Sequence, residues 1–156
     1  MSGGLMTTPY IHNFTYEAKL SIRFARANAR LFGRSVAGAE DLLFGAMSYE
    51  SPERSSRVAE AIEEVFDVTL QDVQRAIEAI SMRPVVRYTP EDQFTLGAYK
   101  ALELAALRAE EGDATRCDIV VGLVRSEDDI LFHMLGSLNV DPQRLSLVMS
   151  NSLAWS

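Results

Sequence analysis

An internal duplication constrains this chain more than any other feature of its sequence. The segment "FTYEA", which begins at Phe14, is matched by "YTPED" from Tyr88, and each opens a long alanine-rich stretch. "EDLLFGAM" from Glu40 is matched by "CDIVVGLV" from Cys117, and "FDVTLQDVQRAI" is matched by "LNVDPQRLSLVM". Three landmarks in one order predict a repeated unit of about seventy residues. One such unit has too little core to fold alone, so we expect two of them to pack face to face.

Helical periodicity runs through the first copy of the repeat. Apolar residues recur at helical spacing between residues 15 and 32, namely at Ala18, Ile22, Ala25 and Ala29. Gly33 suits the end of this helix, because glycine readily takes the left-handed conformation. Further helices are predicted at residues 39–48, in "RVAEAIEEVF" after Ser55 or Ser56, and in "LQDVQRAIEAI" after Thr69. The sequence therefore predicts an all-α protein of about eight helices in two pseudo-symmetric four-helix repeats.

The predicted domain organisation follows from the repeat. Residues 1–13 form an N-terminal extension, and residues 14–152 form one double domain. Repeat one covers residues 14–81 and repeat two covers residues 88–152, with Pro90 at a first helical position. The connector at residues 82–87 contains Pro84 and two valines, which interrupt the helical pattern.

Composition excludes several classes of function. The net charge of −7 argues against binding to nucleic acid, against a helix-turn-helix transcription factor and against binding to an anionic membrane. No basic segment precedes an apolar run near the N-terminus, so no signal peptide is predicted and a cytoplasmic location is expected. Cys117 is the one cysteine, which excludes an internal disulfide. His12 and His133 are too few and too far apart in sequence to suggest a metal site, and no cofactor is expected.

The order of these landmarks resembles a known repeat. "FT.EA" is followed by Ala25 and Ala29, then by Gly33, then by Glu40 with "DLLFGAM", and then by "DVTLQDVQRAI". This pattern resembles the Clp N-terminal repeat, which occurs in duplicate at the front of Clp chaperone ATPases. The resemblance covers residues 14 to 152. It implies an all-helical domain that receives substrates or adaptor proteins for an unfolding motor.

The resemblance also implies candidate binding residues. Each repeat of the Clp family has a motif like Thr-Glu-His before an apolar run, and here the first copy reads Ala39-Glu40-Asp41. The second copy departs further, with Cys117 in place of the glutamate and Asp118 in place of the histidine. In some Clp proteins the matching glutamate takes part in recognising phosphorylated arginine. The candidate protein-binding residues are therefore Glu40 and Asp41 with Cys117 and Asp118.

The ATPase machinery is not expected in this chain. No G-x-x-x-x-G-K-[ST] segment occurs, and neither Lys19 nor Lys100 follows a glycine, so no ATP binding of that type is predicted. The chain is either a free-standing protein or a part of a longer Clp ATPase. Its expected partners are a Clp ATPase, a Clp protease subunit, an adaptor protein or a substrate polypeptide.

Two interpretations of the acidic pair remain open. Glu40 and Asp41 fall in the first turn of a short helix, where the positive end of the helix dipole favours negative charge by roughly 0.3–1 kcal/mol. On this interpretation the two acids orient a buried helix. On the other, Glu40 also faces a groove and binds a cationic group of a partner.

A basic stripe on the first helix is a further candidate surface. Its members are spaced at i, i+3, i+7 and i+11, namely Arg23, Arg26, Arg30 and Arg34. A solvated helix face with nearby acidic partners is one explanation, and a surface for an acidic adaptor protein is the other.

The main alternative to a binding module is a small helical enzyme. Its active group would be Cys117 or a carboxylate, since a thiol at a helix start can have a lowered pKa. An enzyme requires convergent groups that act as nucleophile, base and orienting residue, and no such set stands out in this sequence. No catalytic residue is therefore assigned, and the binding module is the preferred interpretation.

Overall fold

The computed structural model describes residues 13–81, 94–110 and 112–151. Within these ranges the protein is all-α and contains no strand, which confirms the predicted fold class. The helices are α2 (Tyr16–Leu31), α3 (Ala39–Met47), α4 (Arg57–Phe66), α5 (Leu70–Ser81), α6 (Leu96–Ala109), α7 (Arg116–Ser126), α8 (Asp129–Ser137) and α9 (Pro142–Ser150). Four precede residue 82 and four follow residue 93, as expected for two four-helix repeats.

The two long helices α2 and α6 begin in the same way. Thr15 caps α2 by accepting a hydrogen bond from the Ala18 N–H, and Thr95 caps α6 by accepting one from the Ala98 N–H. The counterpart of "FTYEA" is therefore "FTLGA", which begins at Phe94. The prediction that the helix of the second copy opens at "YTPED" is wrong, because α6 begins at Leu96.

A physical difference explains this error. Phe94 is buried in the core like Phe14, and the threonine that follows each phenylalanine supplies the cap. The residues Tyr88 and Pro90 imitate the start of a helix in sequence, but they lie outside the described residues. The connector predicted at residues 82–87 also lies outside them, so the repeat boundaries stay a prediction.

The tight helix connections agree with the sequence. Gly33 has φ +78° just after α2, as its position suggested. Asp67 and Asn139, from the matched "FDV" and "LNV" turns, have φ 57° and 59°. A left-handed residue at the same place in both repeats turns the chain into the last helix of each repeat, and Asn and Asp tolerate this conformation better than most side chains.

The two repeats interlock at the helix starts. The Thr15 N–H donates to the Ala114 carbonyl at 2.9 Å, so α2 of repeat one begins beside the segment that enters α7 of repeat two. The Thr95 N–H donates to the Ala37 carbonyl, also at 2.9 Å, so α6 begins beside the segment that enters α3. These reciprocal contacts give the protein its approximate twofold symmetry.

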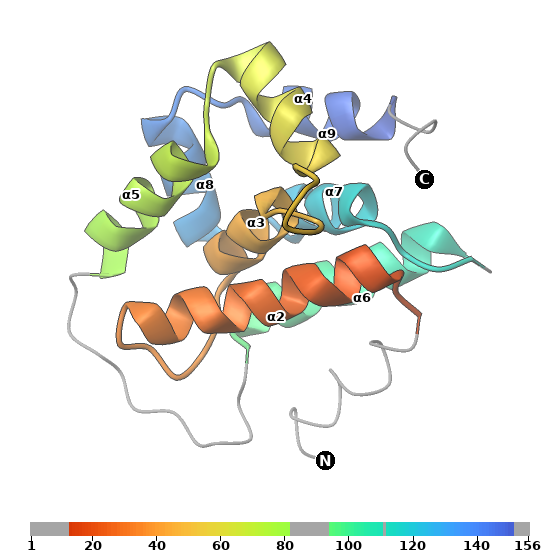
Figure 1. The fold of residues 1–156 in the computed structure, drawn as a ribbon, viewed down its shortest axis with the longest axis horizontal. Helices are drawn as coiled ribbons and strands as arrows, with labels where there is room; N and C mark the ends of the chain where they lie inside the picture. The colour runs from red at the N-terminus through yellow and green to blue at the C-terminus, as the bar shows by residue number, and fades with distance from the viewer. Residues whose placement is uncertain (1–12, 82–93, 111, 152–156) are drawn as a thin grey trace.

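Helices α3 and α7 form the centre of the protein. In Figure 1 they lie between α2 and α6 on one side and the remaining helices on the other. Nearly every residue of both helices is buried, whereas α2, α4 and α5 bury only one face each. The motif residues Glu40, Asp41, Cys117 and Asp118 lie at the starts of these two central helices.

No helix in the described ranges is both long enough and apolar enough to cross a membrane.

Candidate functional site

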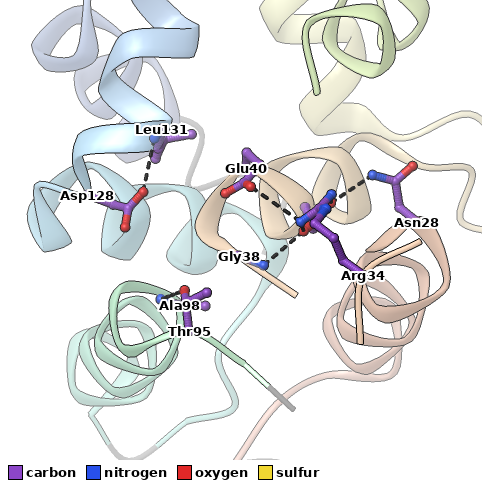
Figure 2. Close-up of polar contacts among 9 residues, drawn as sticks. Asn28, Arg34, Gly38, Glu40, Thr95, Ala98, Asp128 and Leu131 are labelled. Carbon is purple, nitrogen blue, oxygen red and sulfur yellow. Dashed lines mark hydrogen bonds and ion pairs between the residues drawn. The ribbon is translucent and has the colours of Figure 1, made fainter. Parts of the chain in front are cut away.

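Asp41 is the centre of a buried polar network in repeat one. Its side chain has no solvent exposure. Arg34 donates to both carboxylate oxygens, at 2.6 and 2.8 Å, and Asn28 Nδ2 donates at 2.9 Å. The Gly38 N–H donates at 2.8 Å, which closes the capping box at the start of α3. Figure 2 shows these donors converging on the carboxylate from α2, from the segment after it and from the start of α3.

Glu40 lies next to this network in a less favourable environment. It is only 5% exposed and reaches one nitrogen of Arg34 at 3.4 Å. Asp128, the N-cap of α8, lies on the opposite side of Glu40 from Arg34 (Figure 2). Burial raises the pKa of Glu40 to about 7, the charges of Asp41 and Asp128 add to this effect, and Arg34 opposes it. A buried carboxyl with this pKa is partly protonated near neutral pH.

We expect Glu40→Gln to stabilise the protein at pH 8 by about 1–3 kcal/mol. The Glu40 pKa is about 7 in the folded state and 4.5 ordinarily. Between these values the folded protein binds more protons than the unfolded chain, so the glutamate lowers the free energy of unfolding as pH rises. Glutamine does not ionise and removes this loss. Urea denaturation of both proteins at pH 5, 6, 7 and 8 measures the difference, and curves that stay parallel across this range contradict the assignment.

The second copy of the motif has a different polar arrangement. Asp118 accepts from the Arg108 Nε at 2.9 Å and from the Thr115 N–H at 2.9 Å, which again forms a capping box. Its side chain is 17% exposed, in contrast to that of Asp41. Cys117 is buried, and burial together with the charge of Asp118 raises its thiol pKa to about 11. A thiol with this pKa is almost entirely un-ionised at neutral pH and is a poor nucleophile.

Arg116 is a functional candidate that sequence reasoning did not identify. It is the first residue of α7 and only 4% exposed. Its Nε donates to the Glu17 carbonyl at 2.8 Å, and one terminal nitrogen donates to the carbonyls of Ala46 and Ser48 at the end of α3. Arg116 thereby ties repeat two to repeat one. A lone arginine in the motif "RCDIVVGLV" carries no sequence signal of burial, because arginine is rarely buried.

The basic stripe of α2 is shorter in the structure than in the sequence. Arg34 follows the end of the helix and turns inward to Asp41 and Glu40, so it does not belong to an outer face. Arg23 and Arg30 are exposed and Arg26 is half-buried. None of these three arginines forms an ion pair with another described residue.

Two surface hollows lie apart from the motif residues. One, of about 250 Å³, lies along α2 and is lined by Tyr16, Lys19, Leu20, Ile22, Arg23 and Arg26. The other, of about 520 Å³, lies between α5 and α8 and contains Asp129 and His133 beside alanine and isoleucine side chains. No group of three or more potential metal ligands gathers anywhere in residues 13–81, 94–110 and 112–151.

Comparison with known proteins gives a structural match only. No family model matches the sequence, and no curated protein matches it significantly. The crystal structure of the N-terminal domain of the caseinolytic protease associated chaperone ClpD from Arabidopsis thaliana superposes with a TM-score of 0.72 at 18% identity. The match covers 91% of this chain and 98% of the ClpD domain. The protein therefore has the fold of a Clp N-terminal domain.

Proposed function

We propose that this protein is a non-enzymatic protein-binding module of the Clp system, which engages substrates, adaptors or Clp ATPase and protease subunits in regulated proteolysis or protein quality control. The observation that carries the proposal is the match of nearly the whole chain to the complete N-terminal domain of ClpD. The shared fold leaves outer helix faces available for other proteins, because α3 and α7 are buried along nearly their whole length while α2, α4 and α5 bury only one face each.

The chemistry of the candidate active groups argues against the alternative enzyme. Cys117 is buried with a raised thiol pKa, and among the described residues His133 lies in the hollow between α5 and α8 rather than beside Cys117. The carboxylate of Asp41 is fully occupied by Arg34, Asn28 and Gly38, so it is not placed to act on a substrate. A nucleophile needs an adjacent base or a lowered pKa, and within the described part of the chain Cys117 has neither.

The outer face of α2 is the surface we assign to partner binding. Arg23, Arg26 and Arg30 have no acidic partner among the described residues, and burial together with the charge of Arg30 lowers the pKa of Arg26. The adjoining hollow combines Arg23 and Arg26 with Tyr16 and Leu20. Unpaired arginines beside apolar side chains favour an acidic segment that also carries apolar residues. This surface suits the acidic adaptor interpretation of the stripe.

Glu40 and Asp41 have a mainly structural role in this proposal. Asp41 holds Arg34 and the start of α3 in place, and Glu40 is almost closed off from solvent. Direct binding of a partner's cationic group by Glu40 requires that group to compete with Arg34. Asp118 retains some exposure beside Arg108, so it is the more accessible of the two equivalent aspartates. The binding roles of Glu40, Asp41, Cys117 and Asp118 stay predictions.

We expect the purified protein to bind at least one purified Clp ATPase, Clp protease subunit or Clp adaptor of its own organism. The double substitution Arg23→Glu with Arg26→Glu is expected to weaken the complex by about tenfold or more, because it places two acids where an acidic partner docks. Arg75→Glu, at an exposed arginine of α5, is the matched control and leaves affinity unchanged. Isothermal titration calorimetry measures all three. Absence of binding to every Clp component contradicts the proposed function, while equal binding by both variants places the interface on another surface.

A further inference from the structure

A cavity of about 150 Å³ lies at the junction of the two repeats. Its wall contains the first residues of three helices from different parts of the chain: α2 at Thr15 and Glu17, α4 at Arg57 and Val58, and α7 at Arg116 and Cys117. The loop before α4 completes the wall with Glu50 and Arg54. This cavity belongs to neither the Glu40 network nor the outer face of α2.

The three helix starts make the cavity a donor-rich environment. The N–H groups of the first two residues of a helix have no acceptor within that helix, and they carry the positive end of its dipole. The caps Thr15, Ser56 and Thr115 accept from the third residue of their respective helices, so they leave these first N–H groups without a partner in the cap. Anions bind at such helix starts because the N–H groups and the dipole act together.

Three guanidinium groups strengthen the same preference. Arg54 and Arg57 are exposed at the mouth, whereas Arg116 is buried in the wall. One terminal nitrogen of Arg116, Nη2, is buried and has no hydrogen-bond partner. Its other two nitrogens bind only carbonyl oxygens, and no carboxylate lies within ion-pair distance of it among the described residues. Burial lowers the pKa of Arg116, and the charges of Glu50 and Glu17 oppose this effect without cancelling it. A buried arginine charge that is only partly compensated favours a further anion nearby.

Two acids in the wall limit this preference without reversing it. Glu50 is engaged by Arg54 at 3.7 Å, and Glu17 is the other carboxylate. Three arginines against two glutamates leave the cavity with a positive balance before the helix starts are considered. Cys117 adds no charge, because its thiol is un-ionised at neutral pH.

We propose that this cavity binds an oxyanion, the carboxylate or phosphate group of a ligand, through the N–H groups at the starts of α4 and α7 and through the guanidinium groups of Arg54, Arg57 and Arg116. A carboxylate or phosphate group matches the planar, forked geometry of arginine donors. The neutral thiol of Cys117 leaves room for this group at the start of α7. The equivalent position in repeat one holds the carboxylate of Glu40 and excludes an anion.

Nuclear magnetic resonance titration of the full chain at constant ionic strength tests the site. The probes are inorganic phosphate, N-acetylalanine as a peptide C-terminal carboxylate, and N-acetylalanine amide as its uncharged control. We expect saturable shifts of the Val58 and Cys117 amide signals with phosphate, with N-acetylalanine, or with both, and the stronger probe identifies the source of the oxyanion. The uncharged amide control is expected to leave these signals unchanged.

Substitutions separate a specific site from general charge screening. The double substitution Arg54→Gln with Arg57→Gln changes two exposed residues. It is expected to lower the affinity for the more tightly bound probe by at least about tenfold. Arg125→Gln removes an exposed arginine from the end of α7 and is expected to have no effect. Arg116→Met tests the contribution of the buried guanidinium group, provided that circular dichroism shows an intact fold. If this variant does not fold, the result for Arg54→Gln with Arg57→Gln alone tests the proposal. Shifts that do not saturate, or that are equal in the double variant and wild type, overturn the proposal.

Discussion

Replacing Gly45 by alanine is expected to destabilise the protein by about 3 kcal/mol or more. A Cβ atom at Gly45 lies 2.0 Å from the Ser21 carbonyl oxygen and 3.2 Å from the Ala25 backbone nitrogen. Both atoms belong to the backbone of α2, so no side-chain rotation relieves the clash. Helices α2 and α3 must separate, which opens the packing of repeat one.

The duplication extends this expectation to Gly122. A Cβ there lies 2.3 Å from the Ala101 carbonyl oxygen of α6, the equivalent contact in repeat two. We expect Gly122→Ala to lower the free energy of unfolding by a similar amount. Domains of this size are stable by only about 5–15 kcal/mol, so the double substitution is expected to leave much of the protein unfolded.

Gly136 supplies the matched control. It lies inside α8, and a Cβ added to it meets no other atom within 4 Å, so Gly136→Ala adds a methyl group without a clash. Alanine is a better helix former than glycine by about 1 kcal/mol, so this variant is expected to be as stable as wild type or slightly more stable. Urea denaturation of the three single variants measures the effects. Wild-type stability of Gly45→Ala would show that α2 and α3 do not approach as closely as described.

Asp41→Ala is expected to have the second large effect, about 3 kcal/mol or more. The substitution removes the acceptor of Asn28 Nδ2, of the Gly38 N–H and of two nitrogens of Arg34. These donors are partly or fully buried, so water replaces the lost carboxylate poorly. It also removes the N-terminal capping box of the most buried helix in repeat one.

Asp118→Ala is the matched control for this result. Asp118 also forms a capping box and an ion pair, but its side chain and that of Arg108 are 17% and 22% exposed. Water reaches both groups, so we expect a cost of about 1–2 kcal/mol, close to that of losing a helix cap. Thermal and urea denaturation of both variants measure the two losses of stability, which can then be compared. Equal losses at the two aspartates contradict the argument that burial makes the repeat-one network the stronger one.

The Asp41 variant has a second readout besides stability. The charge of Asp41 contributes to the raised pKa of Glu40, and Arg34 opposes it. Without Asp41, the guanidinium of Arg34 pairs with Glu40 alone. We therefore expect the Glu40 pKa to fall in Asp41→Ala and the dependence of stability on pH between 5 and 8 to become weaker than in wild type. A merely unfolded variant does not produce this change.

The helices of repeat one were predictable because their signals are local. Ser56, one of the two predicted caps of α4, and the left-handed Gly33 after α2 each act on a few neighbouring residues, and the structure has both. The start of α6 was not predictable in the same way. Two threonines follow aromatic residues in that region, Thr89 after Tyr88 and Thr95 after Phe94, and in the structure Thr95, which follows the buried Phe94, caps α6.

The candidate site was also predictable only where its features depend on local sequence. The sequence correctly paired Asp41 with Asp118 and Gly45 with Gly122, because each pair occupies one position in a repeated helix. It did not predict that Arg34 leaves the basic stripe to bind Asp41, since that contact depends on how the chain turns after α2.

The sequence by itself determined that this is a duplicated all-helical protein, where the helices of repeat one begin and end, and which positions of the central helices in the two copies are equivalent. Those properties follow from periodicity and from caps that act within one turn of a helix. Only the tertiary structure decided which charges are buried and what they contact: Arg116 reaches the end of α3 from the other repeat, and three helix starts meet around one cavity. Such contacts join residues far apart in sequence, and their energy depends on burial, which no local pattern of residues specifies.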